Sequence, residues 1–234
     1  AMDDPRNQLV HHFVRIVEEV QPKYFVFENV KGLTIGEHKK FLAEIIEGFR
    51  QIGYQVVEDY KVLNASDFGV PQDRKRLFLM GARKDCDLPQ YPTATHERSG
   101  LKTSTSLLKA TPTVWDAIGD LPEADDFDEL FHRDWVRTRF KEPSGYSIGL
   151  RQKPDEEGYE QLSSSMRTVH TTLSQKRFSQ TPFGESEAVS RFLKLDPNGL
   201  CNTLRAGTAS DRGAFTSPRP IHPYRPRCIT VREA

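Results

Sequence analysis

Two stretches near the start of the chain repeat apolar residues at the spacing of an α-helix. The first predicts a helix over 3–20 capped by Asp4, and the second predicts a helix over 41–52 ended by Gly53. The apolar positions are Leu9, Phe13, Ile16, Val17 and Val20, then Phe41, Leu42, Ile45, Ile46, Phe49 and Ile52. Each helix should therefore pack one face against a core.

Three other stretches, 24–27, 54–63 and 76–82, have the apolar and β-branched residues of strands. The run 24–27 is continuously apolar, which predicts a strand buried on both faces and followed by Glu28 and Asn29. The order helix, strand, helix, strand, strand predicts an α/β fold, part of a doubly wound sheet of Rossmann type that ends in a hairpin.

The pattern changes after Lys84. Prolines, a glycine and a Ser/Thr-rich stretch at 103–106 indicate a linker, a short helix is predicted over 113–119, and the stretch 123–129 is acidic. Periodicity is weak from residue 130 onward. We therefore expect a second, smaller and irregular α+β or β-rich domain with short strands and long loops.

Composition restricts the class of protein. The 234 residues carry 33 Lys+Arg and 33 Asp+Glu, so the formal net charge is zero, which argues against a globally basic nucleic-acid-binding protein. The longest apolar runs have about four residues, too short for a membrane span. The 3 cysteines are widely spaced, which predicts neither a disulfide scaffold nor a zinc site.

Glu28 follows a predicted buried strand, where open α/β sheets bind ligands, so its carboxylate is a candidate for acid/base chemistry. The alternative is a surface glutamate that caps a loop. Arg74 and Arg76 share one face of an extended chain and suit a phosphate or a base-edge acceptor. The alternative there is a solvated charge run at the start of a strand.

The stretch 202–232 is rich in arginine. It contains six arginines and one aspartate, a surplus of five positive charges, with glycine, serine, threonine and proline between the arginines. Such a segment can read a groove or clamp phosphates. The alternative is a solvated basic loop.

Together these segments resemble the DNA (cytosine-5)-methyltransferases over residues 3–83 and 203–234. The matching motifs, in order, are Asp4-x-Arg6-x-x-Leu9, Pro22-x-x-Phe25-x-x-Glu28-Asn29-Val30, Phe68-Gly69-Val70-Pro71-Gln72-x-Arg74-x-Arg76 and Arg227-x-x-Thr230-x-Arg232-Glu233-Ala234. The resemblance implies the C-terminal half of a catalytic domain at 1–84, a target-recognition domain at 85–226, and a return segment at 227–234.

The resemblance implies a role for each matched residue. Glu28 would meet N3 and the exocyclic amine of a cytosine flipped out of duplex DNA, and Arg76 would contact its O2, with Asn29 and Arg74 in supporting roles. Gln72, Thr203, Leu204, Arg205, Arg212 and Arg219 are the implied DNA-binding residues. Arg227, Thr230, Arg232 and Glu233 match a structural motif that packs the recognition domain onto the catalytic one.

The family's nucleophile is a cysteine after proline, but Cys86, Cys201 and Cys228 follow other residues. The glycine-rich loop for S-adenosyl-L-methionine is also missing. We therefore expect a fragment, inactive alone, of a prokaryotic restriction–modification enzyme that works on double-stranded DNA in the cytoplasm, near the nucleoid. The strand at 24–27 would be a bare sheet edge, which favours self-association or pairing with a missing N-terminal half. No metal is implied.

Two other functions stay open. One is a non-catalytic DNA-binding module built on the same recognition domain. The other is a tRNA-acting relative with the same chemistry, which the long segment 85–226 and the absence of a Cys-Phe-Thr signature argue against.

Overall fold

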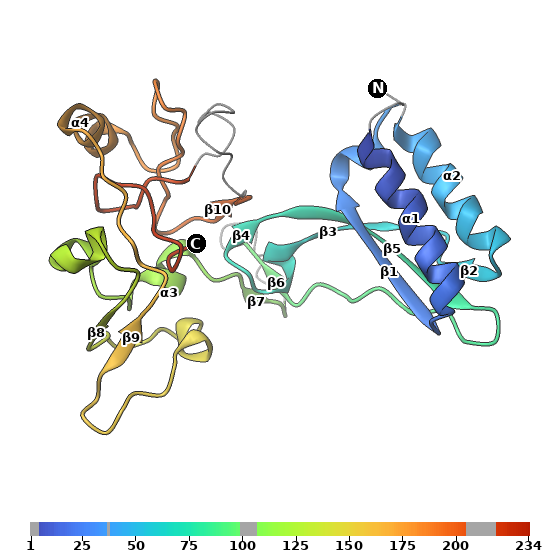
Figure 1. Ribbon diagram of the computed structural model, residues 1–234, viewed down its shortest axis with the longest axis horizontal. Coiled ribbons are helices and arrows are strands. Elements are labelled where there is room, and N and C mark those ends of the chain that lie inside the picture. The colour runs from blue at the N-terminus through green and yellow to red at the C-terminus, as the bar shows by residue number, and fades with distance from the viewer. Residues whose placement is uncertain (1–4, 37, 99–106, 205–218) are drawn as a thin grey trace. The chain divides into compact units, whose positions relative to one another are not determined.

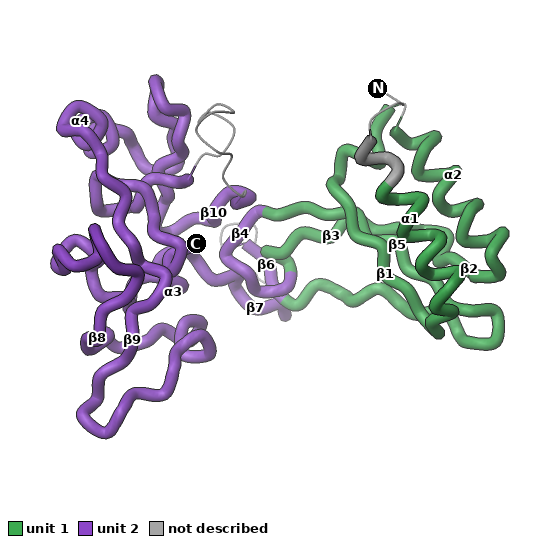
Figure 2. Tube along the Cα trace, viewed as in Figure 1, with its two compact units in different colours: residues 1–67, 74–95 green, residues 68–73, 96–234 purple. Residues whose placement is uncertain are grey.

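The computed structural model describes residues 5–36, 38–98, 107–204 and 219–234. The chain forms two compact units, one of residues 1–67 and 74–95 and the other of residues 68–73 and 96–234 (Figure 2). The chain therefore leaves the first unit, returns to it through Arg74, and leaves it again after Thr95. Whether these units act as a catalytic and a recognition domain, with the boundaries expected above, stays a prediction.

The first unit is a small antiparallel sheet with two helices (Figure 1). Helix α1 (Pro5–Val20) and helix α2 (His38–Gln51) lie where the sequence predicts them, although Asp4 is outside the described residues. Strand β5 (Lys75–Arg83) is central and pairs antiparallel with β1 (Tyr24–Val30), β2 (Tyr54–Val56) and β3 (Lys61–Asn64). A 3₁₀ turn, Lys31–Thr34, follows β1, and another spans Ala65–Phe68.

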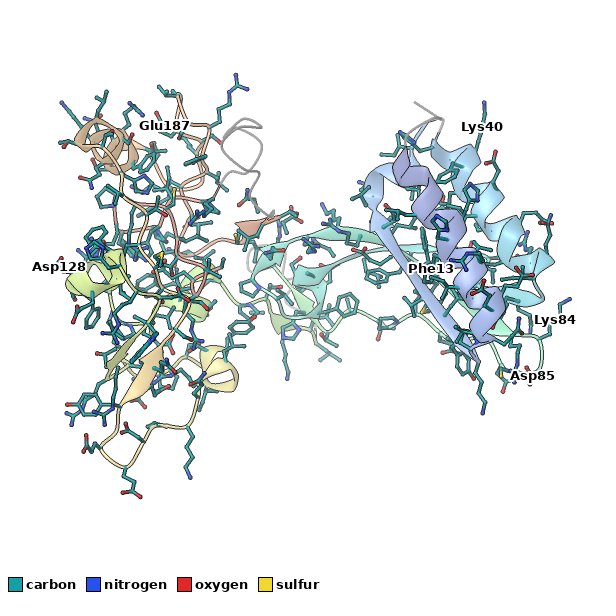
Figure 3. The ribbon with its side chains drawn as sticks, viewed as in Figure 1. Phe13, Lys40, Lys84, Asp85, Asp128 and Glu187 are labelled. Carbon is teal, nitrogen blue, oxygen red and sulfur yellow. The ribbon has the colours of Figure 1, made fainter. Side chains whose placement is uncertain are left out.

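The core of this unit lies between the two helices and one face of the sheet. Phe13 of α1, labelled in Figure 3, meets the rings of Phe25, Phe27 and Phe49 at centroid distances of 5.7–6.5 Å. Phe25 stacks on Phe49 at 4.0 Å. A Cβ atom on Gly81 would meet the Phe25 ring at 2.3 Å, so β5 needs glycine where the aromatic cluster crosses it.

The expectation that the first strand is buried on both faces is wrong. Phe25 and Phe27 are buried, but Tyr24 and Val26 on the other face are 50% and 55% exposed. The reason is that α1 and α2 pack on the same face of the sheet. The strand also runs on to Val30, so Glu28 and Asn29 lie within it rather than after it.

The single strand expected over 54–63 is two strands. Both β2 and β3 pair with β5, and the chain between them turns at Glu58 and Asp59, which are exposed. Two acidic residues in succession are poor strand formers and are better solvated in a turn.

The second unit is irregular, as the weak periodicity predicts. Among its described residues, the strands form three pairs: β4 (Gln72–Asp73) with β10 (Cys201–Asn202), β6 (His96–Glu97) with β7 (Lys109–Ala110), and β8 (Val136–Thr138) with β9 (Glu160–Leu162). Its helices are α3 (Val114–Ile118) and α4 (Thr172–Gln180), with 3₁₀ turns at Ala124–Asp126, Asp128–Phe131 and Ser147–Leu150.

Helix α3 confirms the short helix expected over 113–119. Thr113 accepts a hydrogen bond from the backbone N–H of Asp116, whose carboxylate accepts one from the N–H of Thr113. This reciprocal capping lets a helix of 5 residues form. No helix in the described part of the chain is long and apolar enough to cross a bilayer.

Candidate functional site

Glu28 and Arg76 form an ion pair on the open face of the sheet. In the register of β1 and β5, Glu28 is opposite Phe78 and Val30 is opposite Arg76, so the two charged residues are diagonal neighbours. The Nε atom of Arg76 lies 3.0 Å from Oε1 of Glu28. The side chains are 18% and 47% exposed, so the pair is ordered by the sheet and still reachable by a ligand.

The backbone around Arg74 is held by the 64–65 segment. The N–H of Arg74 donates to Oδ1 of Asn64 at 2.9 Å, and its carbonyl accepts from the N–H of Ala65 at 3.0 Å. Asn29 uses its side-chain oxygen to accept from the N–H of Val30 at 2.8 Å. Both residues therefore belong to the same unit as the ion pair, and their roles stay predictions.

In the second unit, the strand of Gln72 lies beside the segment that leads into Thr203 and Leu204. Strand β4 pairs in parallel with β10, and the N–H of Cys201 donates to the carbonyl of Pro71 at 2.9 Å. The hydroxyl of Thr203 donates to the carbonyl of Asp73 at 3.0 Å, across 130 positions of sequence. Leu204 packs against the core of this unit. The structure thus brings the strand of Gln72 beside the Thr203-Leu204 segment, about 130 positions later in the sequence.

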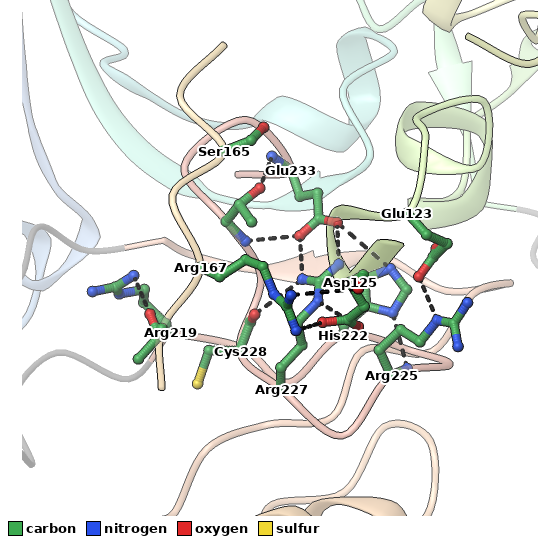
Figure 4. A network of polar contacts seen from close by, with 12 residues as sticks. Glu123, Asp125, Ser165, Arg167, Arg219, His222, Arg225, Arg227, Cys228 and Glu233 are labelled. Atoms are coloured by element: carbon green, nitrogen blue, oxygen red, sulfur yellow. Dashed lines mark hydrogen bonds and ion pairs between the residues drawn. The ribbon is translucent and has the colours of Figure 1, made fainter. Parts of the chain in front are cut away.

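Arg227 is the centre of a buried charge network (Figure 4). Its side chain is 6% exposed and donates two hydrogen bonds of 2.8 Å to the Glu233 carboxylate. Its Nε atom donates to Asp125 at 3.1 Å, and Asp125 also pairs with Arg167 at 2.8 Å. The bidentate bond holds Arg227 to Glu233. The bond to Asp125 attaches this part of the chain to the 123–128 segment.

Thr230 and Glu233 cap each other in the same network. The N–H of Thr230 donates to Oε2 of Glu233 at 2.7 Å, and the N–H of Glu233 donates to the Thr230 hydroxyl at 3.3 Å. Burial alone would raise the pKa of the Glu233 carboxyl. The hydrogen bonds from Arg227 outweigh burial, so the pKa of Glu233 lies below its usual value. The N–H of Arg232 donates to the carbonyl of Ser164 at 2.8 Å.

His222 is buried beside this network. Its Nδ1 atom accepts from the N–H groups of Tyr224 and Arg225, both at 3.1 Å. Burial lowers the pKa of His222, although Glu233, 3.8 Å from Nε2, opposes the change. The imidazole is therefore neutral at pH 7 and acts as an acceptor in the turn.

The positive surplus of the stretch 202–232 is partly cancelled in the structure. Arg225 pairs with Glu123, and Arg227 pairs with Asp125 and Glu233. The partner of the acidic stretch 123–129 could not be predicted from the sequence, because charge alone does not say which segments meet. Arg219 donates to the hydroxyl of Thr168 at 3.2 Å. Arg205 and Arg212 lie outside the described residues.

Two of the cysteines are buried thiols. Burial raises the pKa of Cys201 and of Cys228 to about 11, so neither is a thiolate at neutral pH. Across the described residues, no group of three or more His, Cys, Asp or Glu side chains could hold a metal ion.

The chain is similar to DNA methyltransferases over its whole length. The family model described as C-5 cytosine-specific DNA methylase matches residues 1–234. The type II methyltransferase M.XorII of Xanthomonas oryzae is 57% identical over 243 residues, with 100% of this chain and 54% of that protein covered. M.MthTI, a type II methyltransferase of Methanothermobacter thermautotrophicus, is 40% identical over 122 residues, covering 52% of this chain and 32% of that protein.

A solved structure agrees with these matches. A crystal structure described as a DNA modification methyltransferase encoded within a prophage of E. coli superimposes with a TM-score of 0.68 at 30% identity. The match covers 99% of this chain and 63% of that one. The chain spans about half the length of M.XorII. With a family model that matches every residue from 1 to 234, this protein belongs to the C-5 cytosine-specific DNA methylases.

Proposed function

We propose that this chain is part of an enzyme that flips a cytosine out of double-stranded DNA and methylates its C5 atom. The observation that carries the proposal is the Glu28–Arg76 pair, 3.0 Å apart and accessible on the sheet face. The relatives named above are type II methyltransferases, which favours a restriction–modification role. The enzyme would act in the prokaryotic cytoplasm, at the nucleoid.

Glu28 and Arg76 suit the two polar edges of a cytosine. Attack at C6 pushes electron density toward N3 and O2, and a hydrogen bond or proton at N3 stabilises that charge. Glu28 would hold N3 and the exocyclic amine, while the guanidinium of Arg76 would donate to O2. The hydrogen bond from Nη1 of Arg76 to the carbonyl of Lys75, 2.9 Å, keeps the guanidinium oriented for this contact. Cytosine must leave the base stack to reach both groups.

The other matched residues would support DNA binding. Arg74 and Asn29 would position the loop around the base, and Gln72, Thr203, Leu204 and Arg219 would contact the duplex, together with Arg205 and Arg212. Arg227, Thr230, Arg232 and Glu233 would keep the end of the chain in place. The buried network around Arg227 supports this structural role, because its charges are satisfied inside the protein.

Members of this family use S-adenosyl-L-methionine, but the residues described here do not fit it. The sequence has no Gly-x-Gly, the minimal pattern of a loop that cradles a nucleotide. After β1, a Cβ atom on Gly32 would meet only Val30, at 4.0 Å, so the space beside this glycine is open and no described residue walls in a ligand there. We therefore place neither the methyl donor nor the nucleophile in this chain, and we expect the isolated chain to be inactive.

Methyl transfer from labelled S-adenosyl-L-methionine to DNA tests the proposal. The chain alone should give none, and addition of the N-terminal half of a relative such as M.XorII should restore it. Glu28→Gln in the restored complex should lower transfer at least about 100-fold, whereas Glu44→Gln on the exposed face of α2 should not. Turnover by the chain alone would contradict the assignment of the nucleophile.

Binding measurements made beside this assay separate the alternatives. DNA binding without restored activity would identify a binding module instead of an enzyme. Preferential competition by tRNA over duplex DNA would identify a tRNA-acting relative.

A further inference from the structure

A cavity of about 260 Å³ lies in the second unit, beside helix α3. Its lining comes from the end of α3 with Asp120 and Leu121, from the 3₁₀ turn Ser147–Leu150 with Arg151, and from Arg232. Neither Glu28 nor Arg76 lines it. The proposed cytosine contacts therefore do not account for this cavity.

Asp120 has a buried carboxylate oxygen without a hydrogen bond. Its side chain is 2% exposed, and Oδ2 accepts from Nη1 of Arg151 at 2.9 Å. The other oxygen, Oδ1, has no hydrogen-bond donor among the described residues. A buried polar atom without a partner is costly and rare in folded proteins. A donor group that binds in the cavity would remove this cost.

Arg151 is held between two carboxylates. Its Nε atom donates to Glu160 at 3.0 Å, Nη1 donates to Asp120 and to the carbonyl of Lys141, and Nη2 pairs with the second oxygen of Glu160. One guanidinium thus serves two acidic side chains that are 2% and 3% exposed. This arrangement leaves one negative charge beside the cavity without a matching cation.

Arg232 brings an unpaired cation to the same cavity. Its backbone N–H donates to the carbonyl of Ser164 at 2.8 Å, which holds the residue in place. Its guanidinium makes no hydrogen bond or ion pair with any residue that the structure describes. Ala117, Leu121 and Leu150 add apolar surface. The wall therefore offers an acceptor, a cation and an aliphatic patch.

We propose that this cavity binds a free α-amino acid with an aliphatic side chain. The ammonium group would donate to Oδ1 of Asp120, and the carboxylate would accept from the guanidinium of Arg232. The side chain would lie against Leu121 and Leu150. The volume suits so small a ligand, because drug-sized ligands occupy cavities of about 300–1,000 Å³.

Other small ligands match only part of the wall. An inorganic anion would meet the excess negative charge of Asp120 and Glu160, whereas a metal ion or a simple amine would be repelled by Arg232. Water can satisfy Oδ1 but gains nothing from the aliphatic surface. A zwitterion matches both charges, and an aliphatic side chain uses the rest of the wall.

The inference does not depend on the proposed function, so it is tested by direct binding. L-leucine is titrated with the chain and followed by ligand-observed NMR, beside 4-methylpentanoate, which lacks the ammonium group, and 3-methylbutylamine, which lacks the carboxylate. L-leucine should bind with a Kd of about 1 mM or tighter. Loss of either charged group should weaken binding at least about tenfold, because each group makes a charge-assisted hydrogen bond.

Two variants assign the contacts. Asp120→Asn keeps the shape of the side chain and removes its charge, so L-leucine should bind it no better than 4-methylpentanoate does. Arg232→Gln should bind L-leucine no better than 3-methylbutylamine. Thermal melting of each variant establishes that it is folded, and the comparison of the three ligands on the wild-type chain stands without either variant.

Arg133→Gln is the matched control. Arg133 lies in the same unit, stacks on Trp135 at 4.2 Å and does not line the cavity. This variant should keep the affinities of the wild-type chain for all three ligands.

Several results would overturn the inference. No binding of L-leucine at about 10 mM would leave water as the occupant of the cavity. Equal binding of L-leucine and 4-methylpentanoate would show that Asp120 accepts nothing from the ligand, and equal binding of 3-methylbutylamine would show the same of Arg232 as a donor. A preference for L-leucine over both analogues that survives in the two variants would place the binding site elsewhere on the chain.

Discussion

The guanidinium of Arg227 and the carboxylate of Glu233 form two parallel hydrogen bonds of 2.8 Å, with both side chains 6% exposed. Asp125 takes the third contact of the guanidinium, from Nε at 3.1 Å. The pair closes a short loop of chain and ties it to a segment about 100 residues earlier. A buried charge of this kind is tolerated only while its partners stay in place.

Arg227→Met should therefore destabilise the second unit strongly. Methionine keeps much of the volume but leaves Glu233 and Asp125 without their common partner, which costs about 3–5 kcal/mol when a buried pair is broken. Urea unfolding measures the change. Arg15→Ala is the control, since Arg15 and Glu19 are more than half exposed and the pair contributes about 0.5 kcal/mol or less. Equal effects of the two substitutions would contradict the structural role of Arg227.

The neutral form of His222 should make folding sensitive to mild acid. Burial lowers its pKa from the ordinary 6.5, so His222 contributes stability that is complete above pH 6.5 and is lost as the pH falls through the lowered value. His222→Asn keeps an acceptor for the turn and removes the titration. Urea unfolding between pH 7 and 5 measures how the free energy of unfolding changes with pH. This slope should be smaller in the variant than in the wild type, by at most about 1.4 kcal/mol per pH unit.

His170 provides an internal comparison for this measurement. Burial, with Arg219 and Arg227 nearby, also lowers its pKa, so part of the acid sensitivity should remain in His222→Asn. An unchanged slope in that variant would show that His222 is already charged in the folded protein.

The spacing of apolar residues predicted those elements that bury one face against the core. The helices α1 and α2 were predictable because their apolar residues recur on one side, where Phe13 and Phe49 meet the sheet. The burial of β1 was not predictable, because a continuous apolar run does not say whether one or both faces of the strand are covered. The strand stays exposed at Val26 since both helices pack on its other side.

The candidate site residues could be predicted from motifs, but the side chains that they contact across the fold could not. Glu28 and Arg76 were chosen from sequence, and the register of β1 and β5 explains why they meet. The pairing of Arg227 with Asp125 spans 102 positions and needs the tertiary fold. The cavity at Asp120 could not be predicted from the sequence, since its lining comes from three short segments without a shared motif.

Glu28 should matter more for activity than for stability. Its side chain is 47% exposed, so loss of the pair with Arg76 in Glu28→Gln should change the free energy of unfolding by less than about 1 kcal/mol. Methyl transfer by the complete enzyme should fall at least about 100-fold, because the group at N3 acts in the transition state. Single-turnover kinetics, with DNA binding measured in parallel, tests both parts. A large loss of stability with normal turnover would make Glu28 a structural residue.

Cys201 and Cys228 should resist alkylation in the folded chain. With pKa values of about 11, less than about one thiol in a hundred is ionised at pH 8, and both side chains are buried. Cys86 is partly exposed and should react with iodoacetamide first. Mass spectrometry of the modified chain, native and in urea, measures the order. Rapid native labelling of Cys201 or Cys228 would show that the surrounding core opens readily.

Strand β1 should make the isolated chain associate with itself. Within the described residues it pairs only with β5, and Tyr24, Val26 and Val30 leave apolar surface beside its free edge. Such an edge recruits another strand unless it is covered or charged. Sedimentation velocity should show dimers or larger species, and Val26→Lys should shift the chain toward monomer. Val189→Lys, at an equally exposed valine of the second unit, should not. A clean wild-type monomer in which the amides of β1 exchange slowly would show that the edge is protected without a partner.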